Sequence, residues 1–240
     1  KDEQIQSLKF KLKSKDEQIQ SKSDKKYYYD DSSFASDNSS LSFSRFLQGR
    51  HGKGIEYWGN GNGNKKYEGD FVKGKYHGEG IMYCENGNKL YKGDFENSKR
   101  HGKGIEYWKN GEKKKYEGDW SEGKYHGEGI MYYDNINNTN WYEGDFSENK
   151  YHGKGIEYYE SGKKRYDGDW FKGRLHGKGI EFWSGSDKKK YEGDWSENQY
   201  HGKGIEYGEN GKKKYEGEWS ENKYHGKGVN YDRDEHIQYD

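Results

Sequence analysis

The chain has 240 residues, and its 43 Lys and Arg balance its 43 Asp and Glu. It contains 25 Tyr, 8 Trp and 9 Phe but too few aliphatic residues for an ordinary two-layer core. Its single Cys excludes an internal disulfide, and no apolar run approaches the ~18 residues of a membrane-spanning helix.

The N-terminal part of the chain is predicted to be helical. The heptad KDEQIQS occurs twice, two heptads apart. Ile5, Leu12 and Ile19 then share one core position, whereas Lys15 falls in the other. We expect a helix or coiled coil over residues 1–22. A solvated charged helix, a dimer seam and a docking helix all remain open.

A polar segment and a degenerate repeat are predicted next. Residues 23–40 are rich in Ser and contain three consecutive tyrosines at 27–29, so we expect a linker that tracks over a partner. Leu41 and Phe43 occupy the positions that hold Tyr and Gly in later repeats. Residues 41–66 are therefore predicted to cap a repeat array.

Residues 67–231 repeat one phrase seven times: Tyr, any residue, Gly, an acid, then Phe or Trp, with His-Gly ten residues after the Tyr. The period of 24 to 26 residues predicts a stacked array, in which recurring residues do not assemble a catalytic pocket of single-copy groups. Residues 232–240 are expected to begin a further repeat. The seven copies start at Tyr67, Tyr91, Tyr116, Tyr142, Tyr166, Tyr191 and Tyr215.

Each repeat is predicted to be a β-hairpin. The distance from the motif Tyr to the next Ile or Val is constant, so the His-Gly connection is expected to be fixed by packing. All length variation lies in the other connection, which contains pairs such as Asn86-Gly87 and Asn110-Gly111. We expect two-residue turns there with positive φ at both positions, and tolerance of insertions.

Side-chain alternation divides each predicted strand into two faces. Tyr116, Gly118 and Trp120 should share one face, and Glu117 and Asp119 the other. A glycine inside a strand indicates that something packs against bare backbone, and we expect an aromatic ring from a neighbouring strand over Gly118.

The partner strand of the hairpin is assigned by the same alternation. We expect Ile105 and Tyr107 to share the aromatic face, and Glu106 to join the acids. Consecutive hairpins without intervening helices predict an all-β fold, an elongated single-layer antiparallel meander. With strands ~4.8 Å apart, seven hairpins should extend over ~70 Å.

The phrases Tyr-Glu-Gly-Asp-Trp and Gly-Lys-Tyr-His-Gly-Lys-Gly resemble the MORN (membrane occupation and recognition nexus) repeat, over roughly Arg50 to Tyr231. The resemblance implies a sheet of stacked hairpins, and scaffold or regulatory roles. Many MORN repeats have Gly three residues before the His. Here three repeats have Asn, and one has Ser98, at that position. Because Asn tolerates positive φ, we expect the turn to be kept.

The repeated histidines and acids invite a metal site, which spacing disfavours. Metal ligands lie ~2 Å from one ion, whereas successive histidines should be ~10 Å apart. We therefore expect structural histidines, hydrogen-bonded within the turn. The acidic row, which includes Glu68 and Asp70, lacks a loop of alternating calcium ligands and has lysines nearby. No catalytic, cofactor or metal site is predicted.

Lysines cluster beside the variable connection, so the sequence predicts a basic edge separated from an acidic face. One interpretation is solubility and protection of strand edges. The other is binding to an acidic protein or an anionic lipid. The basic edge comprises Lys113, Lys114, Lys115, Lys188, Lys189 and Lys190.

Together these features predict a non-catalytic scaffold whose partners are other proteins, and not nucleic acids. The single Cys84 suits the reducing cytoplasm. The resemblance adds helical or cytoskeletal partners and a cytoskeletal or ciliary assembly. A membrane adaptor for phosphoinositides and a regulatory module of an enzyme outside this chain are the alternatives, and homo-oligomerisation remains open. The predicted partner-binding residues are Phe71, Phe95, Trp120, Phe146, Trp170, Trp195 and Trp219.

Overall fold

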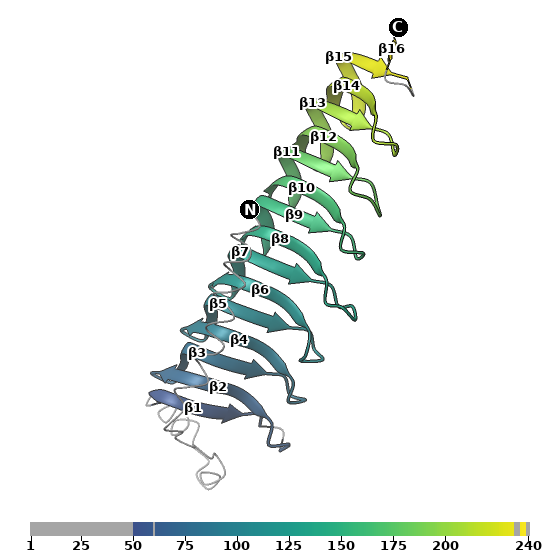
Figure 1. Ribbon diagram of the computed structural model, residues 1–240. Coiled ribbons are helices and arrows are strands. Elements are labelled where there is room, and N and C mark those ends of the chain that lie inside the picture. The colour runs from purple at the N-terminus through teal and green to yellow at the C-terminus, as the bar shows by residue number, and fades with distance from the viewer. Residues whose placement is uncertain (1–49, 60, 233–235, 239–240) are drawn as a thin grey trace, which may run out of the picture.

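A computed structural model describes residues 50–59, 61–232 and 236–238. They form one antiparallel sheet of sixteen strands in sequence order, which confirms the all-β, single-layer prediction (Figure 1). No helix of the described residues could cross a membrane. The helix predicted over 1–22, the linker 23–40 and the start of the cap lie outside the described residues. The strands are β1 (Gly52–Tyr57), β2 (Lys65–Val72), β3 (Lys75–Tyr83), β4 (Lys89–Glu96), β5 (Lys99–Tyr107), β6 (Lys114–Ser121), β7 (Lys124–Tyr132), β8 (Asn140–Ser147), β9 (Lys150–Tyr158), β10 (Lys164–Phe171), β11 (Arg174–Phe182), β12 (Lys189–Ser196), β13 (Gln199–Tyr207), β14 (Lys213–Ser220), β15 (Lys223–Tyr231) and β16 (Ile237–Gln238).

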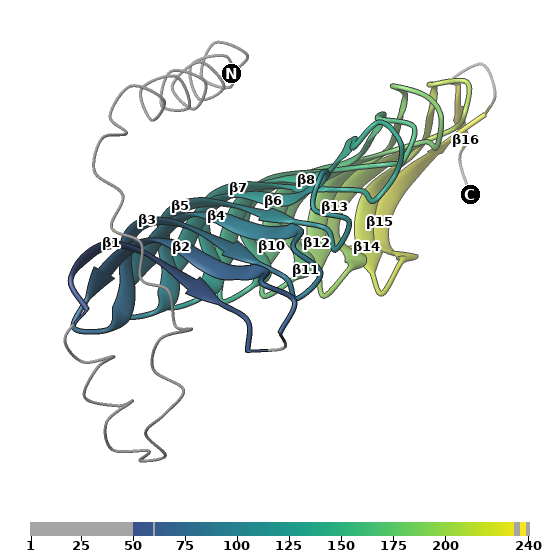
Figure 2. The same ribbon diagram turned by 90° about the horizontal axis from the view of Figure 1, so that it is seen from below.

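The sheet is an elongated rod whose strands run across its long axis (Figure 1). Seen from below, the strands are curved, so the rod has the form of a trough (Figure 2). Tight turns join each even strand to the next odd strand along one edge, and variable loops join odd to even strands along the other (Figure 1).

The tight turns are two-residue turns with positive φ at both positions. Lys73 and Gly74 have φ of 51° and 73°, and Asn97 and Ser98 have φ of 50° and 66°. Asn149 replaces the glycine at φ 66°. This is the combination found in type I′ hairpins, so the prediction that Asn keeps this turn is confirmed. Ser98, for which no such prediction was made, keeps it as well.

The variable loops differ from the prediction. At Asn86-Gly87 only the glycine has positive φ, 86°. The Gly87 N–H donates to the Cys84 carbonyl over 2.9 Å, and the Cys84 N–H to the Asn88 carbonyl over 2.8 Å. This is a three-residue loop ending in a left-handed glycine, so the expectation of positive φ at both positions is wrong. Insertions are accommodated, as at the longer loop closed by Tyr133 N–H and the Thr139 carbonyl, 2.9 Å apart.

The register places glycines opposite glycines and corrects one face assignment. Gly104 lies opposite Gly118, and Glu106 lies opposite Tyr116. Directly opposed side chains of an antiparallel pair share a face. Glu106 is therefore on the aromatic face and Ile105 on the other, the reverse of the prediction. Alternation orders the side chains within a strand, but only the register between strands decides which face each set occupies.

The motif tyrosines cover these glycine pairs. The Tyr116 side chain is fully buried, and its hydroxyl donates to the Asp119 carbonyl over 2.9 Å. A Cβ atom added to Gly118 would lie 2.6 Å from the Tyr116 hydroxyl oxygen and 2.5 Å from the Gly129 Cα. The ring expected over Gly118 is present, but it belongs to Tyr116 of the same strand and not to a neighbouring strand. The Tyr116 ring also covers Gly129 on the neighbouring strand.

Candidate interaction surface

The lower layer of the aromatic face is a continuous core. Trp120 is 3% exposed, and its ring meets those of Tyr91 and Tyr116 edge to face at 5.2 and 5.3 Å. Its indole N–H donates to the Gly104 carbonyl over 3.3 Å. Such rings were predicted to be exposed partner contacts, and that prediction is wrong, because all seven predicted residues are buried. They are Phe71, Phe95, Trp120, Phe146, Trp170, Trp195 and Trp219.

An upper layer covers this core, and the sequence analysis missed it. Tyr76 stacks on Tyr67 with ring centroids 3.8 Å apart, and Tyr125 stacks on Tyr116 at 4.0 Å. Five upper-layer residues are tyrosines, each placed directly before a His-Gly pair, and this position was the available signal. They are Tyr76, Tyr125, Tyr151, Tyr200 and Tyr224.

Carboxylates join the upper layer to the strands beside it. Glu106 is 8% exposed and accepts hydrogen bonds from the Tyr125 hydroxyl and, over 3.1 Å, from Arg100 Nη1. Lys115 Nζ lies 3.4 Å from the same carboxylate. Burial, followed by the nearby Glu106 charge, raises the pKa of Tyr125. We call this arrangement of upper-layer Tyr, Glu and basic side chain the Tyr–Glu–Lys unit.

Two repeats replace the charged pair of this unit by apolar side chains. Met82 stands where five repeats have Glu, and Leu90 stands where those repeats have Lys or Arg. Met131 and Trp141 make the same double replacement. Met82, Met131 and Trp141 are partly buried and pack against the core, and Trp141 stacks with Tyr133 at 5.6 Å. We call the pairs Met82–Leu90 and Met131–Trp141 the apolar windows.

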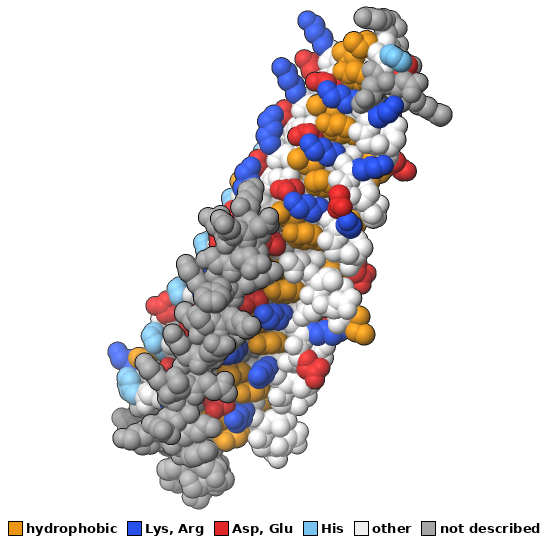
Figure 3. All heavy atoms as spheres, viewed as in Figure 1, with side chains coloured by type: hydrophobic (Ala, Val, Ile, Leu, Met, Phe, Trp, Pro, Cys, Tyr) orange, Lys and Arg blue, Asp and Glu red, His pale blue; other side chains and the backbone are white. Residues whose placement is uncertain are grey.

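Five of the six lysines of the predicted basic edge pair with carboxylates, and the sixth donates to a backbone carbonyl. Lys114 and Lys189 pair with Glu117 and Glu192, each over 2.7 Å, on the face opposite the aromatic rings. Lys115 pairs instead with a carboxylate on the aromatic face. The predicted separation into a basic edge and an acidic face is therefore wrong, because basic and acidic side chains lie among one another on the visible face of the rod (Figure 3). The remaining three lysines contact Asp134 (Lys113), the Glu209 carbonyl (Lys188) and Glu181 (Lys190).

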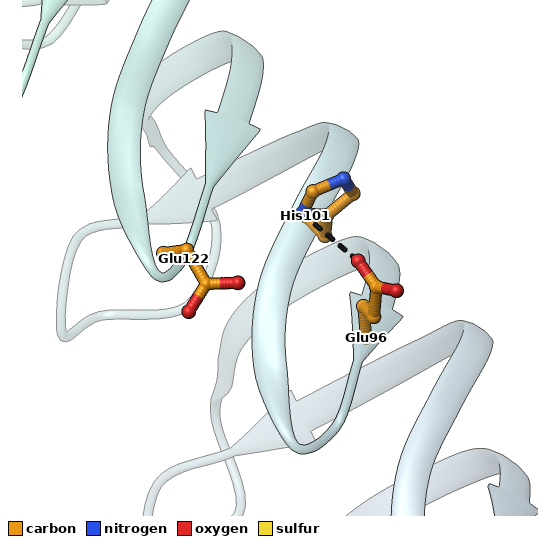
Figure 4. Close-up of side chains that lie close together, drawn as sticks. All are labelled: Glu96, His101 and Glu122. Atoms are coloured by element: carbon orange, nitrogen blue, oxygen red, sulfur yellow. Dashed lines mark ion pairs between the residues drawn. The ribbon is translucent and has the colours of Figure 1, made fainter.

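One cluster has the composition of a metal site. Glu96, His101 and Glu122 come from β4, β5 and the turn after β6, and their ligand atoms lie within 4.8 Å of one another (Figure 4). Glu96 Oε2 is 3.6 Å from His101 Nδ1, and Glu122 pairs with Lys99, which lowers the pKa of that carboxyl. The Lys99 ammonium already supplies the cation here, so ion pairing accounts for the cluster.

The other histidines lie on the tight-turn edge. His77 and His126 are exposed, and no hydrogen bond of their rings is found among the described residues. The expectation that these rings are hydrogen-bonded in the turn is wrong for them. What recurs is the glycine directly after each histidine. Gly78 and Gly127 have φ of 56° and 55° and lie at a shift in the register between neighbouring strands. The backbone thus accounts for the constancy of the His-Gly connection.

Comparison with known proteins gives one family. The family model described as MORN repeat matches eight segments of the chain. A search of curated proteins with the chain found no match. The first match begins before the described residues, and the other seven coincide with the repeats of the sheet. The matched segments are residues 45–63, 67–89, 91–113, 116–135, 142–164, 166–188, 191–213 and 215–229.

Proposed function

The chain belongs to the MORN repeat family, and we propose that it is a non-catalytic scaffold that binds other proteins through the upper layer of its aromatic face. MORN repeats are known for protein or membrane interaction, and the family is generally a structural, non-catalytic repeat. The proposal narrows this to protein partners and to one face of the sheet.

The two apolar windows carry the proposal. A Glu–Lys pair loses hydration when a partner covers it, and this cost offsets much of the gain from contact. A Met–Leu or Met–Trp pair has no such cost, and methionine adapts its shape to what it contacts. The windows are therefore the positions where a partner would bury apolar side chains most favourably.

The spacing of the windows indicates the form of the partner. Met82 is on β3 and Met131 on β7, four strand spacings or ~19 Å apart. About 13 residues of α-helix cover that distance. A helical protein segment with two apolar clusters at this separation, lying along the rod, fits both windows.

The setting proposed for this scaffold is the cytoplasm, which the single Cys suits, in a cytoskeletal or ciliary assembly, which rests on the family resemblance alone. Pairing of the lysines gives less support to the phosphoinositide adaptor, because an anionic lipid would have to compete with Glu117 and Glu192 for Lys114 and Lys189. A regulatory role beside an enzyme domain outside this chain would use the same windows.

Photo-crosslinking tests the proposal directly. The chain contains two methionines, Met82 and Met131, one in each window. Photo-methionine introduced at these two positions would therefore report only on what lies over the windows. We expect cross-links to protein segments in the native assembly, absent from the matched Met82→Leu, Met131→Leu control. Cross-links to lipid, or none above the control, would contradict the proposal.

A further inference from the structure

Leu175 interrupts the row of upper-layer tyrosines. Four upper-layer tyrosines donate their hydroxyl to the Glu of the preceding repeat, as Tyr76 does to Glu56 over 3.1 Å and Tyr224 to Glu206 over 2.5 Å. Tyr151 donates to the Met131 sulfur instead, and Arg100 takes the position in one further repeat. Leu175 occupies the equivalent position beside Glu157 but has no hydroxyl. The hydrogen bond that Glu157 receives comes from Arg165.

A hollow of 470 Å³ opens around Leu175, since leucine is smaller than tyrosine. This volume lies within the ~300–1,000 Å³ range of ligand pockets. The hollow combines buried apolar side chains with two neighbouring charged pairs, Glu157–Arg165 and Glu181–Lys190. Its lining includes Leu175, Trp170, Trp195, Glu157, Arg165 and Lys190.

A phenol side chain matches this chemistry. Its ring would contact the apolar side chains, and its hydroxyl would donate to Glu157, as the intact units do with their own tyrosines. A buried hydroxyl needs such a partner, and a hydrogen bond to a charged group is stronger than one between neutral groups. The occupant should therefore be a tyrosine brought from outside the sheet.

The chain carries such tyrosines at residues 27–29, between Lys25-Lys26 and Asp30-Asp31. This sequence of two cations, three phenols and two anions complements a hollow that offers carboxylates and basic groups side by side. Opposite charges on both flanks favour one orientation of the segment over the reverse.

The segment can reach the hollow. Arg50, where the described array begins, precedes a His-Gly pair just as Leu175 does, and its guanidinium lies over Phe71 in the same upper layer. From β1 to β11 is ten strand spacings, ~48 Å. The ~22 residues from Tyr28 to Arg50 extend to ~73 Å. A short covalent link of this kind gives effective concentrations in the mM range.

We propose that the tyrosine segment 27–29 docks onto its own array, with one phenol filling the hollow beside Leu175. The docked segment would cover β9 to β12 and leave both apolar windows free. This inference does not depend on the proposed function, because it concerns contacts within one chain.

A photoreactive benzoylphenylalanine at position 28 of the full chain tests this. We expect cross-links to residues around Leu175, within one chain and unaffected by dilution. Leu175→Tyr supplies the missing phenol, so it should reduce these cross-links about tenfold, given the loss of both the space and the free hydrogen-bond position at Glu157. It repeats what five other repeats contain, so it should fold, and thermal melting checks that.

Tyr224→Phe is the matched control, since it removes a hydroxyl from another unit and leaves the hollow intact. It should leave the cross-links unchanged. Hydrogen exchange gives a second measurement: replacing Tyr27, Tyr28 and Tyr29 by Ser should speed exchange in β9 to β12 but not in β2 to β5. Cross-links spread over the array, cross-links between chains that vanish on dilution, or cross-links indifferent to Leu175→Tyr would each overturn the inference.

Discussion

The hairpins β3–β4 and β5–β6 have almost the same buried layer but different upper layers. Both place a motif Tyr over a glycine pair and an aromatic ring beside it. Above that layer β3–β4 carries Met82 with Leu90, whereas β5–β6 carries Glu106 with Lys115. The comparison separates two functions of one face: the buried layer specifies the fold in every repeat, and the layer above it distinguishes one repeat from another.

Raising the pH should destabilise the buried layer more than any single substitution. Burial raises the pKa of the motif tyrosines, among them Tyr116, Tyr142 and Tyr191. Unfolded tyrosine has a pKa near ~10, so this contribution to stability is fully present below pH ~10 and is lost as pH rises through the folded pKa. Between the unfolded and the folded pKa, each buried tyrosine lowers the free energy of unfolding by about 1.4 kcal/mol per pH unit.

Tyrosinate absorbance and circular dichroism, followed together above pH 10, measure this. We expect a cooperative transition in which ionisation of the buried tyrosines and loss of the sheet coincide. Gradual ionisation of all tyrosines with the sheet intact would mean that the motif rings are accessible.

Trp120→Ala should be the most damaging single change to the buried layer. The side chain is 3% exposed and contacts two motif tyrosines. Removing a buried Trp typically lowers the free energy of unfolding by about 3–5 kcal/mol. Chemical denaturation measures the loss, with Ile136→Ala, at an exposed loop residue, as the control. An unchanged denaturation midpoint would mean that Trp120 is not part of the core and is free to bind a partner.

Gly118→Val should come next. The new Cβ would meet the Glu128 carbonyl at 2.5 Å, and backbone cannot move away as a side chain can. Such overpacking costs about 1–3 kcal/mol. Gly162→Ala is the matched control, since its Cβ meets nothing within 4 Å and it bears only the strain of φ 81°, about 1 kcal/mol. Equal shifts of melting temperature in the two variants would refute the packing of tyrosine over glycine.

The sequence predicted the buried layer well and the upper layer poorly, for a physical reason. The period of the phrase is read directly from the chain, and the alternation of Tyr116, Gly118 and Trp120 lies within one strand. Neither prediction requires the register between strands. The position of Glu106 depends on which residue stands opposite, and the Gly104–Gly118 pairing that decides it is visible only in three dimensions.

The exposure of the predicted binding residues depended on the same missing information. Aromatic rings on a flat single layer would be open to a partner, and this was the expectation. Tyr125 closes over Tyr116, and the strands curve, which no spacing reveals (Figure 2). The joint replacement at Met82–Leu90 and Met131–Trp141 was readable in the sequence, but it acquires meaning only after Glu106 and Lys115 are seen to pair.

Closing the apolar windows should have the smallest effect on stability and a clear effect on binding. The variant Met82→Glu, Leu90→Lys gives β3–β4 the charged pair of β5–β6, so the free energy of unfolding should change by no more than about 0.5 kcal/mol. Partner binding should weaken about tenfold or more, because a charged pair must lose its hydration where an apolar contact had formed.

The reverse change, Glu206→Met with Lys214→Leu, creates a window elsewhere and should not weaken binding. Denaturation and the affinity for the cross-linked partner are measured on the same preparations. A loss of stability like that of Trp120→Ala would place the windows in the core. Unchanged affinity in a folded variant would move the binding surface away from the methionines.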